Sequence, residues 1–164
     1  MKVAIFSDIH DNLSNLDLAL DAVDQCETLI FCGDFCAPFT LKHLADRFSH
    51  PIHVVFGNND GDKFLLTTIA TQHDHVTLHG EMMSIEIADL KIAANHYPQI
   101  ARQIALAAEH NVVFYGHNHQ HNIETVGETL FINPGEIMGR FDDPTFVIFD
   151  TVNLQVELKH IRGR

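Results

Sequence analysis

The stretch KVAIFSDIHDNLSNLDLALDAV, residues 2–23, decides the fold class. Its first part, residues 2–7, is short, apolar and β-branched, which predicts a buried strand. Its last part, residues 13–23, places leucines and a valine at helical spacing, which predicts a helix. Between the two lie Asp8 and His10, polar residues at the carboxyl end of the predicted strand.

The alternation of strand and helix continues through the first half of the chain. Strands are predicted at 28–33 and 51–57, and helices at 39–48 and 62–70. This order implies parallel strands joined by right-handed crossovers. In the second half, one strong helix is predicted at 99–110. The other elements are strands, two around the Ala88–Asp89 turn and the rest at 111–116, 123–127, 129–134, 145–150 and 153–161. A mostly parallel first half and a strand-rich second half predict two sheets packed face to face with helices outside.

Length and composition predict one globular domain over residues 1–164, because 46% of the residues are hydrophobic and 20% are charged. A net charge of -12 argues against a general nucleic-acid binder but leaves open a small phosphate substrate held by a cation. No signal-peptide pattern and no apolar stretch of membrane-spanning length occurs, so a cytoplasmic protein without membrane contact is expected. Three cysteines fit a reducing compartment and are expected to be small hydrophobic residues rather than metal ligands.

Polar residues follow the carboxyl ends of five predicted strands, where sites form in open α/β sheets. They are Asp8 and His10, Asp34, Asn58 with Asn59 and Asp60, Asn95 and His96, and His117 and His119. Each alone has an ordinary explanation as a helix cap, a turn residue or a buried histidine. Together they form a set of carboxylates, imidazoles and amides without lysine or arginine, whose mutual repulsion cations would relieve. Mixed oxygen and nitrogen ligands suit manganese, iron, zinc or nickel.

The same residues form an ordered series of motifs. They are DIH at 8–10, GD at 33–34, GNND at 57–60, NHYP at 95–98 and GHNH at 116–119. This order resembles the calcineurin-like metallophosphoesterase superfamily. The segment INPGE at 132–136 is similar to the N-P-G-S segment of its small bacterial and archaeal phosphodiesterase subgroup. The resemblance implies an α/β fold, a four-layer α/β/β/α sandwich of two mixed sheets flanked by helices, with two metal ions at its edge.

The resemblance also implies the ligands of those two divalent ions. The first metal would be held by Asp8, His10, Asp34 and His119, and the second by Asp34, Asn58, His96 and His117. Asp34 would bridge two cations roughly 3.5–4 Å apart, and a hydroxide shared by the metals would be the nucleophile. Manganese is favoured, with nickel, iron and zinc as alternatives. His121 falls outside the motif and is expected at the surface.

Departures from the family pattern concern proton transfer and charge. Asn59 stands where many relatives have a histidine near the leaving group, and an asparagine donates a hydrogen bond but no proton. Asp60 is expected to orient its neighbours. Tyr97, which replaces a second histidine, is expected to pack, with a hydrogen bond to phosphate as the alternative. Asp11 and Glu136 are expected to add carboxylates at the mouth of the site. An acidic rim disfavours dianionic monoesters, so a phosphodiesterase is favoured over a phosphomonoesterase.

The main alternative is a catalytically weak scaffold or binding module, because the eukaryotic retromer scaffold subunit is built on this same small fold. The presence of all seven predicted ligands favours an enzyme acting on a small phosphate ester. Arg140, the nearest cation after Glu136, is expected to be an ordinary surface residue. An exposed sheet edge is compatible with a homodimer.

Overall fold

The computed structural model describes residues 1–161, in which strands and helices alternate as far as β4 and strands predominate afterwards. The strands are β1 (Lys2–Phe6), β2 (Thr28–Phe31), β3 (Ile52–Val54), β4 (Val76–Leu78), β5 (Met82–Ile87), β6 (Leu90–Asn95), β7 (Val112–Phe114), β8 (Asn122–Val126), β9 (Thr129–Asn133), β10 (Thr145–Asp150) and β11 (Val156–His160). The helices are α1 (Leu13–Asp21), α2 (Pro38–Arg47), α3 (Lys63–Ala70) and α4 (Pro98–Leu106). No helix within residues 1–161 is long and apolar enough to cross a membrane.

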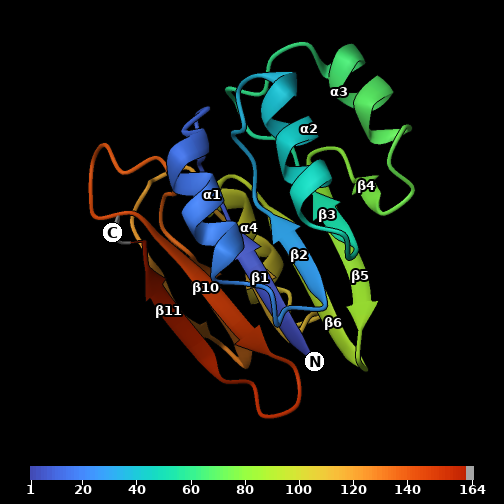
Figure 1. Ribbon diagram of the computed structural model, residues 1–164. Helices are drawn as coiled ribbons and strands as arrows, with labels where there is room; N and C mark the ends of the chain where they lie inside the picture. The colour runs from blue at the N-terminus through green and yellow to red at the C-terminus, as the bar shows by residue number, and fades with distance from the viewer. Residues whose placement is uncertain (162–164) are drawn as a thin grey trace.

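The strands form two mixed sheets. The first has the order β11-β10-β1-β2-β3-β4, in which β1 to β4 are parallel neighbours and β10 runs antiparallel to β1. The second has the order β5-β6-β7-β9-β8, in which β6, β7 and β9 are parallel. The division between the sheets is therefore not a division between the halves of the chain, because β10 and β11 return to the first sheet (Figure 1).

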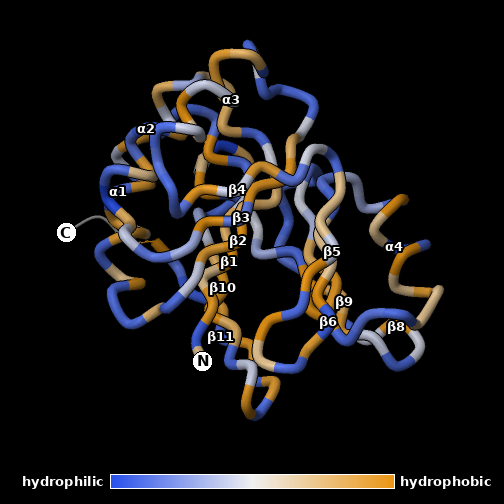
Figure 2. The backbone as a smooth tube through the Cα atoms, turned by 90° about the vertical axis from the view of Figure 1, so that its right-hand side faces the viewer, coloured by the Kyte–Doolittle hydropathy of each residue, from blue (hydrophilic) through white to orange (hydrophobic). Residues whose placement is uncertain are grey.

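The two sheets pack face to face between two layers of helices. Helices α1, α2 and α3 cover the outer face of the first sheet, and α4 covers the second (Figures 1 and 2). Side chains of β1 show how one strand serves two cores: Ala4 and Phe6 pack under the helices, whereas Val3 and Ile5 pack between the sheets. A strand buried on both faces must be apolar throughout. The predicted four-layer sandwich of two mixed sheets is confirmed.

Several strands are shorter than predicted, such as β3, which ends at Val54, and two further elements differ more. Strand β4 was not predicted, because a run of three residues, Val76–Leu78, between histidines is too short to show a period. The last helix was predicted to reach residue 110 but ends at Leu106, since Ala108 has a left-handed backbone with φ of 55°. Both of these larger differences lie away from the strand ends that carry the polar motifs.

Candidate metal centre

The predicted ligands come from both sheets and meet at the carboxyl ends of β1, β2, β3, β6 and β7. The ligand atoms form two groups, and within each group all atoms lie within 4.8 Å of one another. One group is Asp8, His10 and His119, and the other is Asp8, Asp34 and His96. The amide oxygen of Asn58 joins them, 3.1 Å from Nε2 of His96 and 2.8 Å from Nδ1 of His117. All seven predicted metal ligands therefore lie in one cluster.

Two carboxylates form the centre of the cluster. Oδ2 of Asp34 lies 3.5 Å from Nε2 of His10 and 3.4 Å from Nε2 of His96. Oδ1 of Asp8 lies 3.7 Å from Nε2 of His10 and 3.5 Å from Nε2 of His119. Each of these oxygens faces two imidazoles, at separations that exceed a good hydrogen bond. Such spacing is what ligands of a shared ion would show.

The centre contains buried polar atoms without a protein partner. Oδ1 of Asp8 and Nε2 of His10 are both buried and make no hydrogen bond. Such orphaned atoms are rare in native proteins and call for a ligand, a water or an ion. The other oxygen of Asp8 accepts from the Ser7 hydroxyl at 2.5 Å and from the backbone N–H of His117 at 3.1 Å. The carboxylate is thus fixed with one oxygen left free, which fits a metal ligand.

Hydrogen bonds made by Nδ1 set the tautomers of two imidazoles, those of His96 and His119. Nδ1 of His96 lies 2.8 Å from the carbonyl oxygen of Cys32, which can only accept, so this nitrogen carries the proton. Nδ1 of His119 lies 2.5 Å from Oε2 of Glu136 and donates to that carboxylate. In both rings Nε2 is left as a lone-pair donor facing the carboxylates. Acceptors of this kind typically orient metal-ligating histidines.

Nδ1 of His10 has a sulfur atom as its neighbour rather than an oxygen. Its Nδ1 lies 3.2 Å from Sγ of Cys36. Burial, together with nearby carboxylates, raises the pKa of the Cys36 thiol to about 12, so the sulfur stays protonated. Cys26 and Cys32 are buried, as expected of small hydrophobic residues, whereas Cys36 is half-exposed and touches a predicted ligand.

Electrostatic coupling inside the cluster is strong. Burial pushes the pKa of Asp34 upward, but the neighbouring His96 imidazole and the hydrogen bonds from Asn59 outweigh it and hold the pKa well below the usual range. For His96, burial lowers the pKa, while Asp34 and Asp8 raise it above its ordinary value. The nearby carboxylates of Asp8 and Asp34 likewise raise the pKa of His10. The cluster therefore attracts positive charge, whether as protons or as metal ions.

Several predicted ligands have a strained backbone. A left-handed conformation is uncommon outside glycine and costs on the order of 1–3 kcal/mol per residue. It occurs at Asp8 (φ 53°), His10 (φ 44°), Asp34 (φ 67°), His117 (φ 75°) and His119 (φ 62°). Bonds between loops hold it in place: the backbone N–H of Asp8 donates to the carbonyl of Gly33, and that of His10 to the carbonyl of Asp34. Strain gathered at one set of side chains is typical of functional sites.

Glycines in the motifs allow the strand ends to approach one another. A Cβ atom at Gly57 would lie 2.1 Å from Oδ1 of Asp34, and one at Gly116 would lie 2.0 Å from the hydroxyl oxygen of Ser7. Neither clash can be relieved without moving a predicted ligand or the hydroxyl that holds one. The glycine before Asn58 and the glycine before His117 are therefore required by close packing rather than by turn geometry alone.

Asn59 and Asp60 support the cluster in different ways. Asn59 is exposed, and its backbone N–H and its side-chain amide each donate to Asp34 at 2.8 Å. Asp60 is buried and accepts from the backbone N–H groups of Gly57, Asp34, Phe35 and Cys36. Asp60 thus ties the loop after β3 to the loop after β2, which agrees with the expected orienting role.

The expected acidic rim is wrong for Glu136, and Asp11 has a structural contact of its own. Oδ1 of Asp11 accepts from the backbone N–H of Ala37 at 2.9 Å and from the Thr40 hydroxyl at 2.5 Å, so it holds the start of α2. Glu136 is fully buried, and its Oε1 accepts from the backbone N–H groups of residues 140, 141 and 142. Glu136 therefore does not line an open mouth, whereas Asp11 is partly exposed and uses one oxygen to hold the start of α2. The role of Glu136 beside His119 was not predicted, because nothing in the sequence signals a contact across 17 residues.

The remaining residues of interest lie around the cluster. The ring of Tyr97 packs edge-on against His96 and His117, with centroids 5.2 Å apart in both cases, as expected. Arg140 is exposed, as expected, and its guanidinium lies 5.4 Å from the centroid of the Phe141 ring. His121 is exposed and belongs to neither group of ligand atoms.

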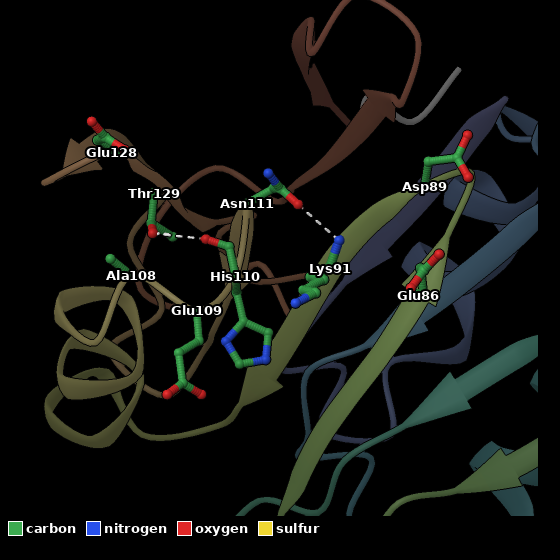
Figure 3. Close-up of a pocket in the computed structure, with 9 residues that line it drawn as sticks. All are labelled: Glu86, Asp89, Lys91, Ala108, Glu109, His110, Asn111, Glu128 and Thr129. Carbon is green, nitrogen blue, oxygen red and sulfur yellow. Dashed lines mark hydrogen bonds between the residues drawn. The ribbon is translucent and has the colours of Figure 1, made fainter.

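A separate cavity of about 390 Å³ lies elsewhere in the molecule (Figure 3). Residues from the β5–β6 turn, the α4–β7 loop and the β8–β9 turn line it, among them Glu86, Lys91 and His110. These segments precede β6, β7 and β9, whereas His96 and His117 follow β6 and β7. Since the three strands are parallel, the cavity lies at the opposite end of the second sheet from the metal-ligand cluster.

Comparison with known proteins agrees with the motif order. A family model described as the calcineurin-like phosphoesterase superfamily domain matches residues 1–154. A phosphodiesterase of Methanocaldococcus jannaschii is 35% identical over 156 residues, covering 92% of this chain and 93% of that protein. The structure of an archaeal phosphodiesterase superposes with a TM-score of 0.90 at 32% identity, over 98% of this chain and 99% of that chain.

A more distant neighbour shares the fold alone. Zinc-bound wild-type Vps29 from Entamoeba histolytica superposes with a TM-score of 0.69 at 19% identity, over 98% of each chain. The family match covers most of the chain, and the archaeal relatives align over nearly their whole lengths. The chain therefore belongs to the calcineurin-like phosphoesterase superfamily of phosphoric ester hydrolases.

Proposed function

We propose that this protein is a phosphodiesterase with a dinuclear metal centre. The first ion would be held by Asp8, His10, Asp34 and His119, and the second by Asp34, Asn58, His96 and His117. The main support is the placement of one oxygen: Oδ2 of Asp34 lies almost equally far from Nε2 of His10 and Nε2 of His96, at 3.5 and 3.4 Å. An oxygen shared by the two ligand sets is what a bridging carboxylate requires.

The chain's own groups prepare the site for this chemistry. When bound, two divalent cations supply a hydroxide from water at neutral pH and neutralise charge on phosphoryl oxygens. Cys32 and Glu136 fix the imidazoles of His96 and His119 with Nε2 directed inward. Asp60 fixes the loops that carry Asp34 and Asn58. These contacts reduce the reorganisation needed when a substrate enters.

The preference for a diester rests on the relatives and no longer on an acidic rim. The curated relative at 35% identity is named a phosphodiesterase. Asp11 and Glu136, which were expected to repel dianionic monoesters, hold backbone groups instead. We further propose that residues 1–164 act as one domain in the cytoplasm on a small phosphate ester, with manganese as the favoured metal and no stable nucleic-acid complex.

The proposal is tested with protein stripped by a chelator and reloaded with single metals. Phosphomonoesters and phosphodiesters are assayed in parallel with manganese, nickel, iron and zinc. We expect turnover to depend fully on added metal and to be faster with diesters. Turnover of monoesters alone would contradict the diester assignment. Absence of turnover with every metal and ester would favour the scaffold function instead.

Exchange of Glu136 for glutamine is expected to lower the affinity for the first metal about 10–100-fold. This is the range found when groups that orient metal ligands are removed. The carboxylate accepts four N–H donors, one from His119 through Oε2 and three from the backbone through Oε1. Glutamine has one acceptor oxygen. If that oxygen faces the backbone, the amide N–H₂ faces Nδ1 of His119 and forces the ring proton onto Nε2, where it blocks metal binding.

Equilibrium dialysis with manganese measures this effect without any substrate. The control is Glu124→Gln, the same exchange at a partly exposed residue paired with Arg102. Thermal melting of both variants separates loss of folding from loss of metal. Equal affinity of Glu136→Gln and the unmodified protein for both ions would show that Glu136 does not orient a ligand.

A further inference from the structure

An exposed phenylalanine stands beside the candidate metal centre. The side chain of Phe141 is 69% exposed, and its ring meets the imidazole of His119 edge-on, with centroids 5.0 Å apart and an interplanar angle of 86°. His119 is a proposed ligand of the first metal. A group on a phosphorus atom bound there would come within reach of the phenyl ring.

Hydrogen bonds to a buried carboxylate fix the backbone position of Phe141. Its backbone N–H donates to Oε1 of Glu136 at 2.7 Å, and so does that of Arg140. The other oxygen of the same buried carboxylate holds His119. One carboxylate therefore positions a proposed metal ligand and the exposed ring together. Single exposed apolar residues are common, but one anchored to the site by a buried charge has a defined place in it.

The surroundings of the ring limit what it can bind. Arg140 lies against the ring, and the next residues, Asp142 and Asp143, are exposed acids. A long aliphatic chain would find no continuous apolar surface among these charged neighbours. A single planar group, in contrast, gains by stacking or edge-on contact with one aromatic ring. A planar group with polar edges, such as a nucleobase, suits this mixture best.

Resting on the phosphodiesterase function proposed above, we propose that Phe141 forms a substrate subsite for a planar aromatic ester group, so that the substrate class is a nucleoside or other aryl phosphodiester. The subsite affects binding of the organic group and leaves the chemistry at phosphorus to the metal centre. Its loss should therefore raise KM for planar substrates and change kcat little.

The kinetic test uses two esters with the same leaving group, thymidine 5′-p-nitrophenyl phosphate and methyl p-nitrophenyl phosphate. Base stacking on an aromatic side chain is commonly worth at least about fivefold in binding. Phe141→Leu should raise KM for the thymidine ester about five- to tenfold and leave that for the methyl ester unchanged. Phe64→Leu, at an 85% exposed phenylalanine of α3, is the matched control. Equal effects on both esters, or on neither, would overturn the subsite.

A second measurement works without turnover. The chain contains no tryptophan, so Phe141→Trp places a single tryptophan in the subsite, whose fluorescence can be excited separately from that of the two tyrosines. In metal-loaded protein, thymidine 5′-monophosphate should quench this fluorescence, and ribose 5-phosphate should not. Quenching without hydrolysis of any ester would support the subsite and refute the enzyme. Hydrolysis of esters without base-specific quenching would support the enzyme and refute the subsite.

Discussion

Replacement of Asp34 by asparagine is expected to remove both metal ions and to lower kcat at least about 10³-fold. Oδ1 of Asp34 accepts from the backbone N–H of Asn59 at 2.8 Å, and Oδ2 faces His10 and His96. Asparagine has only one acceptor oxygen, so its amide N–H₂ must face either the Asn59 donor or the metals. Losing several kcal/mol of charge stabilisation from the metals corresponds to about 10³-fold in rate.

Metal content and rate are measured on the same samples. Asp34→Asn and unmodified protein are loaded with manganese, freed of excess metal and analysed for bound ion, and hydrolysis of bis(p-nitrophenyl) phosphate is then followed. Asp46→Asn is the control, since Asp46 is exposed and paired with Lys42. Circular dichroism checks that the variants are folded. Retention of one ion by Asp34→Asn would mean that Asp34 does not bridge.

The cluster of polar side chains could be predicted because it follows from strand ends, whereas the choice of seven proposed ligands within it came from the resemblance to the family. Parallel strands deliver the residues after their carboxyl ends to one edge of a sheet, so Asp8, Asp34 and Asn58 meet once β1, β2 and β3 pair. His96 and His117 follow β6 and β7 of the other sheet in the same way. Short apolar runs followed by polar residues are a local pattern, and local patterns are visible in a sequence.

The supporting contacts could not be predicted because they depend on tertiary placement. Glu136 in NPGE was expected at a rim, yet it is buried between His119 and the backbone of residues 140–142. Asp11, next to a predicted ligand, bonds the start of α2, which is 26 residues away. Whether a carboxylate faces solvent or a set of N–H donors is decided by loops that carry no periodic signal. The same limit applies to β4, which is paired with β3 but has only three residues.

In the proposed site, Asn59 stands where many relatives have a histidine and offers no acid to the leaving group. Its side-chain amide donates to Oδ2 of Asp34 at 2.8 Å, so it stabilises the proposed bridging carboxylate. An amide cannot transfer a proton near neutral pH. The unmodified protein should therefore show a steep dependence of rate on the pKa of the leaving group and act best on activated aryl diesters.

Exchange of Asn59 for histidine is expected to raise the rate on alkyl diesters about 10²-fold and to change the rate on p-nitrophenyl diesters little. General acid catalysis typically contributes about 10²–10⁴-fold, and a nitrophenolate needs no proton to leave. The lower end of the range is expected because the exchange also removes the hydrogen bond from the side-chain amide of Asn59 to Asp34. The backbone N–H of residue 59 still donates to Oδ1 of Asp34, so the loop should keep its position.

Two matched variants separate acid catalysis from a change in the metal centre. Asn59→Gln keeps an amide without an acid, and Asn59→Ala removes the side-chain hydrogen bond to Asp34 while the backbone one remains. Rates are measured with each variant on a series of aryl and alkyl diesters at saturating metal. If Asn59→Ala accelerates alkyl esters as much as Asn59→His does, the imidazole is not the proton donor.

If the unmodified protein already shows a flat dependence on leaving-group pKa, another group supplies the proton. One candidate is the hydroxyl of Tyr97, whose ring packs against His96 and His117. Tyr97→Phe should then restore the steep dependence, because it removes the hydroxyl and keeps the packing.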